Sequence, residues 1–235
     1  MKILALETVE ISASVALLED TRVIREKYLG AEQRSGKFLT PAVMELLEEV
    51  HWNADEVDLI TLPTGPGSFT GLRVGITFAK TFAYVTGAEI LGFNTLDILA
   101  AQTPSEFPKI AAVMDAQRND VITRTYTTPP SIFSEKDYHH MTPCDGMRVQ
   151  NFNDWLETLS PDTAVTGSLL KRKQKYLPQN LKIVPEEYWS ISLDILGKMA
   201  YDRFQAGQGD SLWEISPIYS RLSAAEERKK IVKNN

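Results

Sequence analysis

The sequence has one cysteine, Cys144, and three histidines among its 235 residues. A single cysteine excludes an intrachain disulfide framework and a cysteine-rich zinc site. No stretch of about 20 apolar residues is present to span a bilayer. The first ten residues, MKILALETVE, lack the basic end, apolar core and small-residue cleavage site of a signal peptide. We therefore expect a cytoplasmic protein that makes no use of a membrane.

Basic residues are also in short supply, with 25 Lys and Arg against 31 Asp and Glu, which gives a net charge of -6. A chain this acidic is a poor candidate for binding a nucleic-acid backbone by itself. Hydrophobic residues make up 43% and charged residues 24%, a mixture that argues against a disordered or fibrous chain. At about 150 residues per domain, the length suits one large domain or two small ones.

Apolar runs and turn residues predict an alternating α/β pattern on both sides of the proline-bounded segment 104–108. In the first half, Thr40 and Pro41 are a typical N-cap and first residue of a helix. The elements expected there are strands at 2–6, 12–18, 22–28, 57–62 and 90–93, and helices at 41–50, 70–85 and 96–102. The second half is expected to hold strands at 110–114 and 121–126, a helix at 152–159, a strand ending at Thr166, and a long helix with Leu193, Leu196, Ala200 and Phe204 on one face.

Two details suggest that the second half repeats the first. Glu7 and Asp115 end the first strand of each half, and Thr64-Gly65 and Thr166-Gly167 end the fourth. We interpret the chain as a duplicated α/β fold with lobes at 1–103 and 104–220 and a charged tail at 221–235. Two unrelated α/β lobes that alternate in a similar way are the alternative.

The most unusual stretch is the loop before the helix at 70–85, where a helix N-terminus can receive an anion. The loop lacks the Lys-Ser/Thr pair of a P-loop and the spacing of a dinucleotide fingerprint, and Ser68 lacks the glycine that a nucleophile elbow needs two residues earlier. A structural strand-to-helix turn is therefore favoured over phosphate binding. Its residues are Gly65, Pro66, Gly67, Ser68, Phe69, Thr70 and Gly71.

The helix that follows carries two apolar stripes, so it needs two surfaces to pack against. One surface would be its own sheet, and the other would be the helix at 41–50 or a partner protein. Gly75 lies inside the helix at a cost of about 1 kcal/mol relative to alanine, which close helix packing would explain. The two stripes are Leu72, Ile76, Ala79 and Ala83, and Val74, Phe78, Phe82 and Val85.

Signals for proton or metal chemistry are sparse. No HExxH motif occurs, and His139 and His140, adjacent on a strand, would point to opposite faces, so we expect no metal site. Glu7 and Asp115 would face the cleft between two lobes and hold a metal–phosphate there, or each would cap a hairpin turn. The run Lys171-Arg172-Lys173-Gln174-Lys175 is either a tRNA contact or, more typically, a solvated helix face.

The segments ILALET, GPGSFTGLRVGITFAK, DAQRNDV and PIYSR closely resemble the TsaB (YeaZ) family of bacterial tRNA threonylcarbamoyladenosine biosynthesis proteins. The resemblance implies the duplicated actin/Hsp70/sugar-kinase (ribonuclease H-like) fold and a scaffold without catalytic residues. Members pair with the related subunit TsaD and, with the ATPase TsaE, support threonylcarbamoyl transfer to adenosine 37 of tRNAs that read codons beginning with A. ATP with Mg²⁺ and threonylcarbamoyl-AMP would be used by that complex rather than by this chain alone. The chain would interact with tRNA through the complex.

The family's dimerisation helices match 41–50 and 70–85, which implies a homodimer when the chain is alone. The implied interface residues are Val43, Met44, Leu47, Val74, Phe78, Phe82 and Val85. Asp115 and Arg118 match a family Asp-Ala-Arg-Arg turn, and Gln117 departs from it. The usual Asp-Thr-Ser is Glu7-Thr8-Val9 here, and a common histidine is missing from 33–37.

The alternative is a nucleotide-binding enzyme of the sugar-kinase type, or a protein related to peptidases, as older family naming implied. A kinase of this fold would need a phosphate loop in the first hairpin, which Glu7-Thr8-Val9 does not supply.

Overall fold

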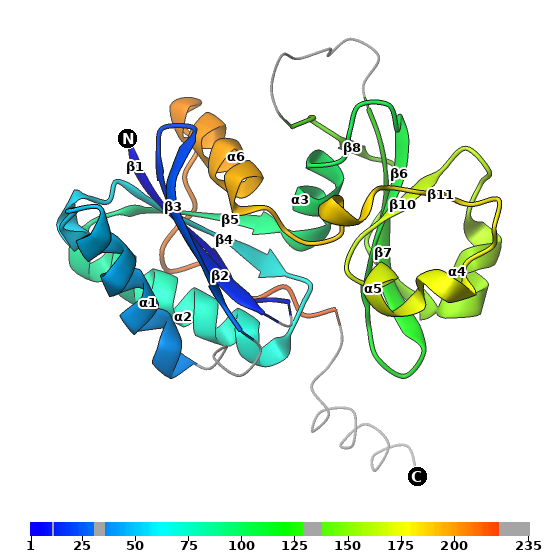
Figure 1. The fold of residues 1–235 in the computed structure, drawn as a ribbon, viewed down its shortest axis with the longest axis horizontal. Helices are drawn as coiled ribbons and strands as arrows, with labels where there is room; N and C mark the ends of the chain where they lie inside the picture. The colour runs from blue at the N-terminus through cyan, green and yellow to red at the C-terminus, as the bar shows by residue number, and fades with distance from the viewer. Residues whose placement is uncertain (11, 31–35, 129–137, 221–235) are drawn as a thin grey trace.

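The computed structural model describes residues 1–10, 12–30, 36–128 and 138–220, and these form two sheets flanked by helices (Figure 1). The first sheet has the order β3-β2-β1-β4-β5. β1 is antiparallel to β2 and parallel to β4, and β4 is parallel to β5. Its strands are β1 (Lys2–Glu7), β2 (Ala13–Glu19), β3 (Arg22–Leu29), β4 (Leu59–Gly65) and β5 (Glu89–Asn94).

The second sheet repeats this topology. Its order is β11-β10-β6-β7-β8, with β9 also paired to β7. β6 is antiparallel to β7 and parallel to β10, and β10 is parallel to β11. The strands are β6 (Lys109–Asp115), β7 (Asp120–Thr127), β8 (Thr142–Pro143), β9 (Arg148–Asn151), β10 (Ala164–Thr166) and β11 (Lys182–Ile183).

The repeat extends to backbone angles. Gly65, after Thr64 of β4, and Gly167, after Thr166 of the equivalent strand β10, have φ of 121° and 123°. A β-carbon on Gly167 would overlap the carbonyl oxygen of Val113, so the glycine is required for close backbone approach. The predicted duplicated α/β fold is therefore confirmed.

The helices form layers on both faces of the sheets (Figure 1). α1 and α2 cover one face of the first sheet, and α6 covers the other. α3 packs between the sheets, against β4, β5 and β6. The helices are α1 (Gly36–Glu49), α2 (Phe69–Thr86), α3 (Thr95–Ala101), α4 (Phe152–Thr158), α5 (Leu170–Lys173) and α6 (Leu193–Gln205), with short 3-10 turns η1 (Ala54–Glu56), η2 (Gln174–Tyr176) and η3 (Glu186–Tyr188).

β1 shows how the sequence generates these layers. Because successive side chains of a strand point to opposite faces, a strand buried on both sides is apolar throughout. Leu4 and Leu6 pack in the cluster beneath α1 and α2, and Ile3 and Ala5 pack in the cluster beneath α6. All four side chains are fully buried.

Two sequence-based expectations about the helices need correction. α1 begins at Gly36, so Thr40 is not its N-cap and Pro41 lies inside the helix. Leu39 is buried on the same face as Val43, and this burial extends the helix by a turn before the proline.

The segment 104–108 separates the two sheets along the chain, and α6 returns from the second half to the first sheet. α6 presents the expected apolar face, yet that face packs on β1 and β2 of the first sheet, not on the second lobe. The charged tail at 221–235 lies outside the described residues. Among the residues described, no helix combines the length and apolar character needed to cross a bilayer.

Candidate functional site

The loop from Gly65 to Gly71 joins β4 to α2 and holds the start of that helix against the β1–β2 turn. A β-carbon on Gly71 would overlap the carbonyl oxygen of Thr8, and one on Gly75 would overlap the Thr8 hydroxyl. Thr8 donates its hydroxyl proton to the Gly71 carbonyl at 2.9 Å. Gly75 therefore permits close packing, as expected, but against a turn and not a second helix.

Three backbone amides around the N-terminus of α2 have partners within the protein. The Ser68 amide donates to the carbonyl oxygen of Val9 at 2.8 Å. The Gly71 amide donates to the Ser68 side chain at 3.2 Å, and the Leu72 amide to the Ser68 carbonyl at 2.8 Å. The bonds of Ser68 and Gly71 satisfy two amides that a phosphate would otherwise bind, whereas the Leu72 bond is the first bond of the helix ladder. The arrangement favours the structural role of the loop.

α2 ends where the sequence indicated, because Gly87 caps it in the left-handed conformation with φ of 81°. The first stripe is buried under the sheet and consists of Leu72, Ile76, Ala79 and Ala83. The second stripe is only partly covered. Val74, Phe78 and Phe82 are half-buried, with the rings of Phe78 and Phe82 stacked at 5.8 Å, and Val85 is 76% exposed.

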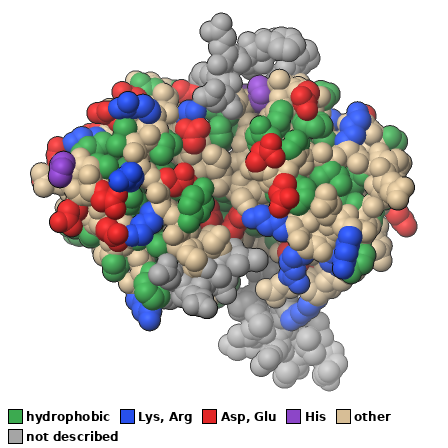
Figure 2. All heavy atoms as spheres, viewed as in Figure 1, with side chains coloured by type: hydrophobic (Ala, Val, Ile, Leu, Met, Phe, Trp, Pro, Cys, Tyr) green, Lys and Arg blue, Asp and Glu red, His purple; other side chains and the backbone are tan. Residues whose placement is uncertain are grey.

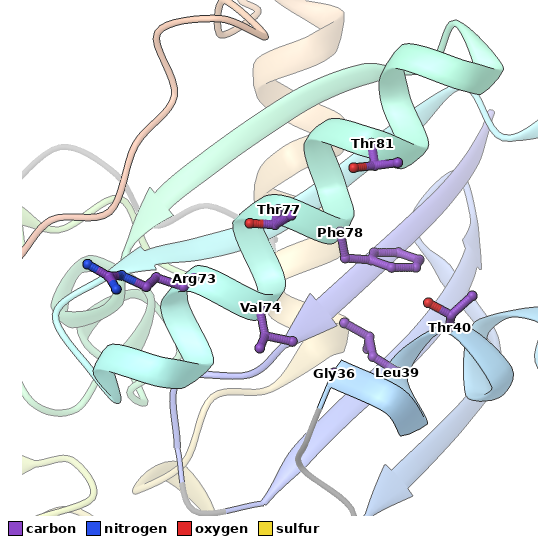
Figure 3. Close-up of a pocket in the computed structure, with 8 residues that line it drawn as sticks. All are labelled: Gly36, Leu39, Thr40, Arg73, Val74, Thr77, Phe78 and Thr81. Atoms are coloured by element: carbon purple, nitrogen blue, oxygen red, sulfur yellow. The ribbon is translucent and has the colours of Figure 1, made fainter.

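An open groove of about 420 Å³ separates α2 from the first turns of α1. Figure 3 shows Phe78 and Val74 pointing from α2 toward Leu39 and Thr40, while Arg73 points away. Thr77 and Thr81 complete the α2 side of the groove. The α1–α2 face therefore combines apolar side chains with a concave surface. We define this face as Met44, Val74, Phe78, Phe82 and Val85 together with the groove.

Two residues predicted for this face do not belong to it. Val43 and Leu47 are buried, with 0% and 1% exposure, in the core between α1 and the sheet. They occupy the side of α1 that faces β2 and β3, so they are inaccessible to a partner. Met44, 52% exposed, is the α1 residue that reaches solvent.

The segment 206–220, which returns from α6 to the first lobe, contacts α2 through Lys80 and Arg73. Lys80 donates to the carbonyl oxygens of Trp213 and Ile215, and Arg73 donates to the Tyr219 hydroxyl at 2.9 Å. The Ile218 amide bonds the Thr64 carbonyl at 2.7 Å. Within the PIYSR segment, Ile218 and Tyr219 thus attach the chain to the first lobe, and Arg221 lies outside the described residues. These contacts leave the α1–α2 face open.

At the end of β1, Glu7 caps its own turn. Its side chain is 3% exposed and accepts hydrogen bonds from the amides of Val9 at 2.5 Å and Glu10 at 2.8 Å. Burial, with a smaller effect of the neighbouring Glu10 carboxylate, raises the pKa of Glu7 to about 8. This is the capping arrangement that the sequence left open for Glu7.

Glu10 connects the two lobes, a role that sequence reasoning missed. Burial raises its pKa, and Lys171 of α5 opposes that shift from a distance of 3.7 Å. The Glu10 carboxylate also accepts a hydrogen bond from the Ile191 amide at 3.3 Å. The lobes are thus joined by a salt bridge as well as by their shared apolar core.

Asp115, the second-lobe counterpart of Glu7, is also engaged. Its carboxylate accepts the Gln117 amide at 2.8 Å and pairs with Arg172 at 2.5 Å. Arg118 lies in the turn that follows, with φ of 52°, between two further left-handed residues. Within the described residues, no group of three or more His, Cys, Asp or Glu side chains is placed to hold a metal ion.

Comparison with known proteins links this geometry to a family. The family model described as "TsaD: tRNA N6-adenosine threonylcarbamoyltransferase" matches residues 30–133. The chain is 30% identical over 159 residues to the tRNA threonylcarbamoyladenosine biosynthesis protein TsaB of Bacillus subtilis, covering 68% of this chain and 66% of that protein. It is 30% identical over 128 residues to TsaB of Escherichia coli, covering 54% and 55%. The matches thus span between about half and two thirds of these relatives.

Two solved structures share the fold over nearly their whole length. YeaZ from Pseudomonas aeruginosa superposes with a TM-score of 0.73 at 23% identity, covering 93% of this chain and 99% of that one. A Pseudomonas aeruginosa protein described as similar to peptidase YEAZ gives 0.72 at 24% identity, covering 94% and 99%. The two-lobed arrangement described above is therefore that of YeaZ.

Proposed function

The chain belongs to the TsaB (YeaZ) family, and from that membership we propose that it acts in tRNA threonylcarbamoyladenosine biosynthesis as a non-catalytic subunit that pairs with TsaD. With TsaE, the pair would transfer a threonylcarbamoyl group to adenosine 37 of tRNA. ATP with Mg²⁺ and threonylcarbamoyl-AMP would be used by the complex, and this chain alone would bind no cofactor.

The observation that carries the proposal is the α1–α2 face. It combines half-buried Phe78 and Phe82 with exposed Met44 and Val85 beside an open groove. Interfaces are enriched in aromatic residues and methionine, and their central anchors fill pockets on the partner. We propose that TsaD covers this face, and that a second copy of the chain covers it when TsaD is absent, because twofold pairing is the commonest way to bury such a surface.

A scaffold role is further supported by the groups that a nucleotide site would require. The Ser68 and Gly71 amides at the start of α2 are bonded within the protein, Glu7 caps its own turn and Asp115 pairs with Arg172. The subunit would act by favouring one conformation of TsaD through contacts that differ between TsaD states. Its effect would then depend on the α1–α2 face and not on a reactive group in this chain.

The proposal is tested by replacing the family protein of a bacterium with this chain and measuring threonylcarbamoyladenosine in bulk tRNA by mass spectrometry. The cognate TsaD is expressed with it, so that the pairing surfaces match. Recovery of the modified nucleoside by the wild-type chain, with loss in Val85→Asp, is the expected result. Full recovery by Val85→Asp would exclude the α1–α2 face as the functional surface.

A further inference from the structure

Beyond the α1–α2 face, the second lobe carries a compact group of cations. Four of the five residues from 171 to 175 are basic, in a chain whose net charge is -6. Figure 2 shows Lys and Arg side chains gathered over the region of α5. We call this group, with the ring beside it, the α5 patch. Its members are Lys171, Arg172, Lys173, Lys175 and Tyr176.

Comparison of α5 with its first-lobe counterpart α2 shows how the α5 patch comes to lie on a short turn. α5 follows β10, the counterpart of β4, as α2 follows β4, but it has 4 residues where α2 has 18. The chain leaves the helix at η2 instead of continuing along the sheet. The second-lobe equivalent of the partner helix is thus a short basic turn at the lobe surface.

Neighbouring groups fix the inner cations of the patch. Lys171 pairs with Glu10 of the first lobe, and Arg172 pairs with Asp115 at the end of β6. Lys173 donates to the side-chain oxygen of Asn119 at 2.8 Å. The carboxylates offset the first two charges, whereas the Asn119 amide holds Lys173 without neutralising it.

Two cations therefore stay uncompensated beside an exposed ring. The ammonium groups of Lys173 and Lys175 lie 5.2 and 4.9 Å from the ring centroid of Tyr176, which is 57% exposed. Within the described part of the chain, neither ammonium group has a carboxylate within ion-pair distance. Proteins that bind single-stranded nucleic acids combine such cations, which contact the backbone, with aromatic rings on which bases stack.

We propose that the α5 patch is an RNA contact surface, at which Lys173 and Lys175 bind backbone phosphates and Tyr176 stacks on an unpaired base of the tRNA substrate. The choice of tRNA rests on the proposed function. A single-stranded loop is favoured over a duplex, because a stacked base in a helix cannot reach the ring. The paired Lys171 and Arg172 keep the turn in place.

The test is fluorescence anisotropy of the full-length chain with a labelled anticodon stem-loop RNA at several low salt concentrations. Lys173→Gln/Lys175→Gln should weaken binding and lower the salt dependence, with the slope of log K against log salt reduced by about 1.4, because each single-strand phosphate contact contributes about 0.7. Tyr176→Ala should weaken binding at least about fivefold, and Tyr176→Phe should preserve it. Arg22→Gln/Lys27→Gln removes the same charge from β3 and should change binding much less.

Several outcomes would overturn the inference. They are no measurable binding of loop RNA at low salt, an equal effect of the β3 control, or equal affinity for a fully paired RNA of the same length. Loss of TsaD pairing instead of RNA binding in Lys173→Gln/Lys175→Gln would assign the patch to an acidic protein surface. Failure of TsaD pairing in the wild-type chain would reject the proposed function while leaving this RNA measurement valid.

Discussion

The Thr8 side chain donates a 2.9 Å hydrogen bond to the carbonyl oxygen of Gly71, and the carbonyl oxygen of Thr8 fills the place of a β-carbon on that glycine. The β1–β2 turn and the first turn of α2 are therefore locked together through backbone atoms. This contact sets the position of α2, and with it the face that we assign to a partner.

Gly71→Ala should destabilise the chain, because a methyl group there overlaps backbone and not a movable side chain. Overpacking of this kind costs about 1–3 kcal/mol, which exceeds the helix-propensity gain of about 1 kcal/mol from alanine. Urea unfolding measures the change. Gly146→Ala is the matched control, since no atom lies within 4 Å of its added carbon. Equal midpoints for the two variants would contradict the close contact.

Val85→Asp should abolish stable pairing with TsaD while the chain remains folded, because Val85 is 76% exposed and has little to lose within the monomer. Removing an interface anchor costs about 2 kcal/mol or more, which corresponds to an affinity about thirtyfold lower. Pull-down and calorimetry with TsaD measure the loss, and circular dichroism checks the fold. Val149→Asp changes an exposed valine of the second lobe in the same way and should pair normally.

Phe82→Asp extends this test to a half-buried position of the same stripe and should likewise prevent copurification with TsaD. Unaltered pairing of both Val85→Asp and Phe82→Asp, with native-like stability, would contradict the proposal that TsaD binds the α1–α2 face.

Glu7 should make the folded chain lose stability as pH rises. Its pKa is raised to about 8 by burial, so between about pH 4.5 and 8 the folded state holds a proton that the unfolded state has released. The free energy of unfolding therefore falls with pH across this window, by up to about 1.4 kcal/mol per unit. The contribution is constant below the window, where both states are protonated, and above it, where both are ionised.

Glu7→Gln keeps the acceptor oxygen for the Val9 and Glu10 amides but cannot titrate. Its unfolding free energy should consequently decline less than that of the wild type between pH 5.5 and 7.5, as measured by urea titration. Parallel pH profiles for the two proteins would contradict a neutral Glu7 in the fold.

Calorimetry of the isolated chain with Mg-ATP or Mg-ADP should give no micromolar binding. The amides of Ser68, Gly71 and Leu72 are bonded within the protein, so they offer no phosphate cradle. Micromolar binding that is lost in Asp115→Ala would instead support the nucleotide-binding enzyme and would contradict the scaffold proposal.

The sequence predicts the central strands well because they are buried on both faces, whereas the largely exposed β8, β9 and β11 were not predicted. Runs such as 3–6 and 110–114 are apolar without interruption, and the Thr-Gly pairs that follow β4 and β10 reveal the duplication. Both signals are local and depend on few residues. The sequence also predicts both stripes of α2, since helical spacing alone defines them.

Tertiary placement was harder to predict. The apolar face of α6 indicates burial but not which sheet covers it, and the choice of the first sheet depends on the path of the whole chain. Val43 and Leu47 were assigned to a partner because an apolar position on a helix can face a sheet or another protein with the same spacing. The glycines at 67, 71 and 75 repeat every four residues, and this pattern could have indicated the close approach to the β1–β2 turn.

Pairing with TsaD is the central claim, and size-exclusion chromatography with light scattering tests it most directly, on the chain alone and mixed with its cognate TsaD. The account predicts a mass of two chains for the protein alone, replaced by a one-to-one heterodimer when TsaD is added. Val85→Asp should be monomeric in both experiments. A wild-type chain that stays monomeric and elutes apart from TsaD would contradict the account.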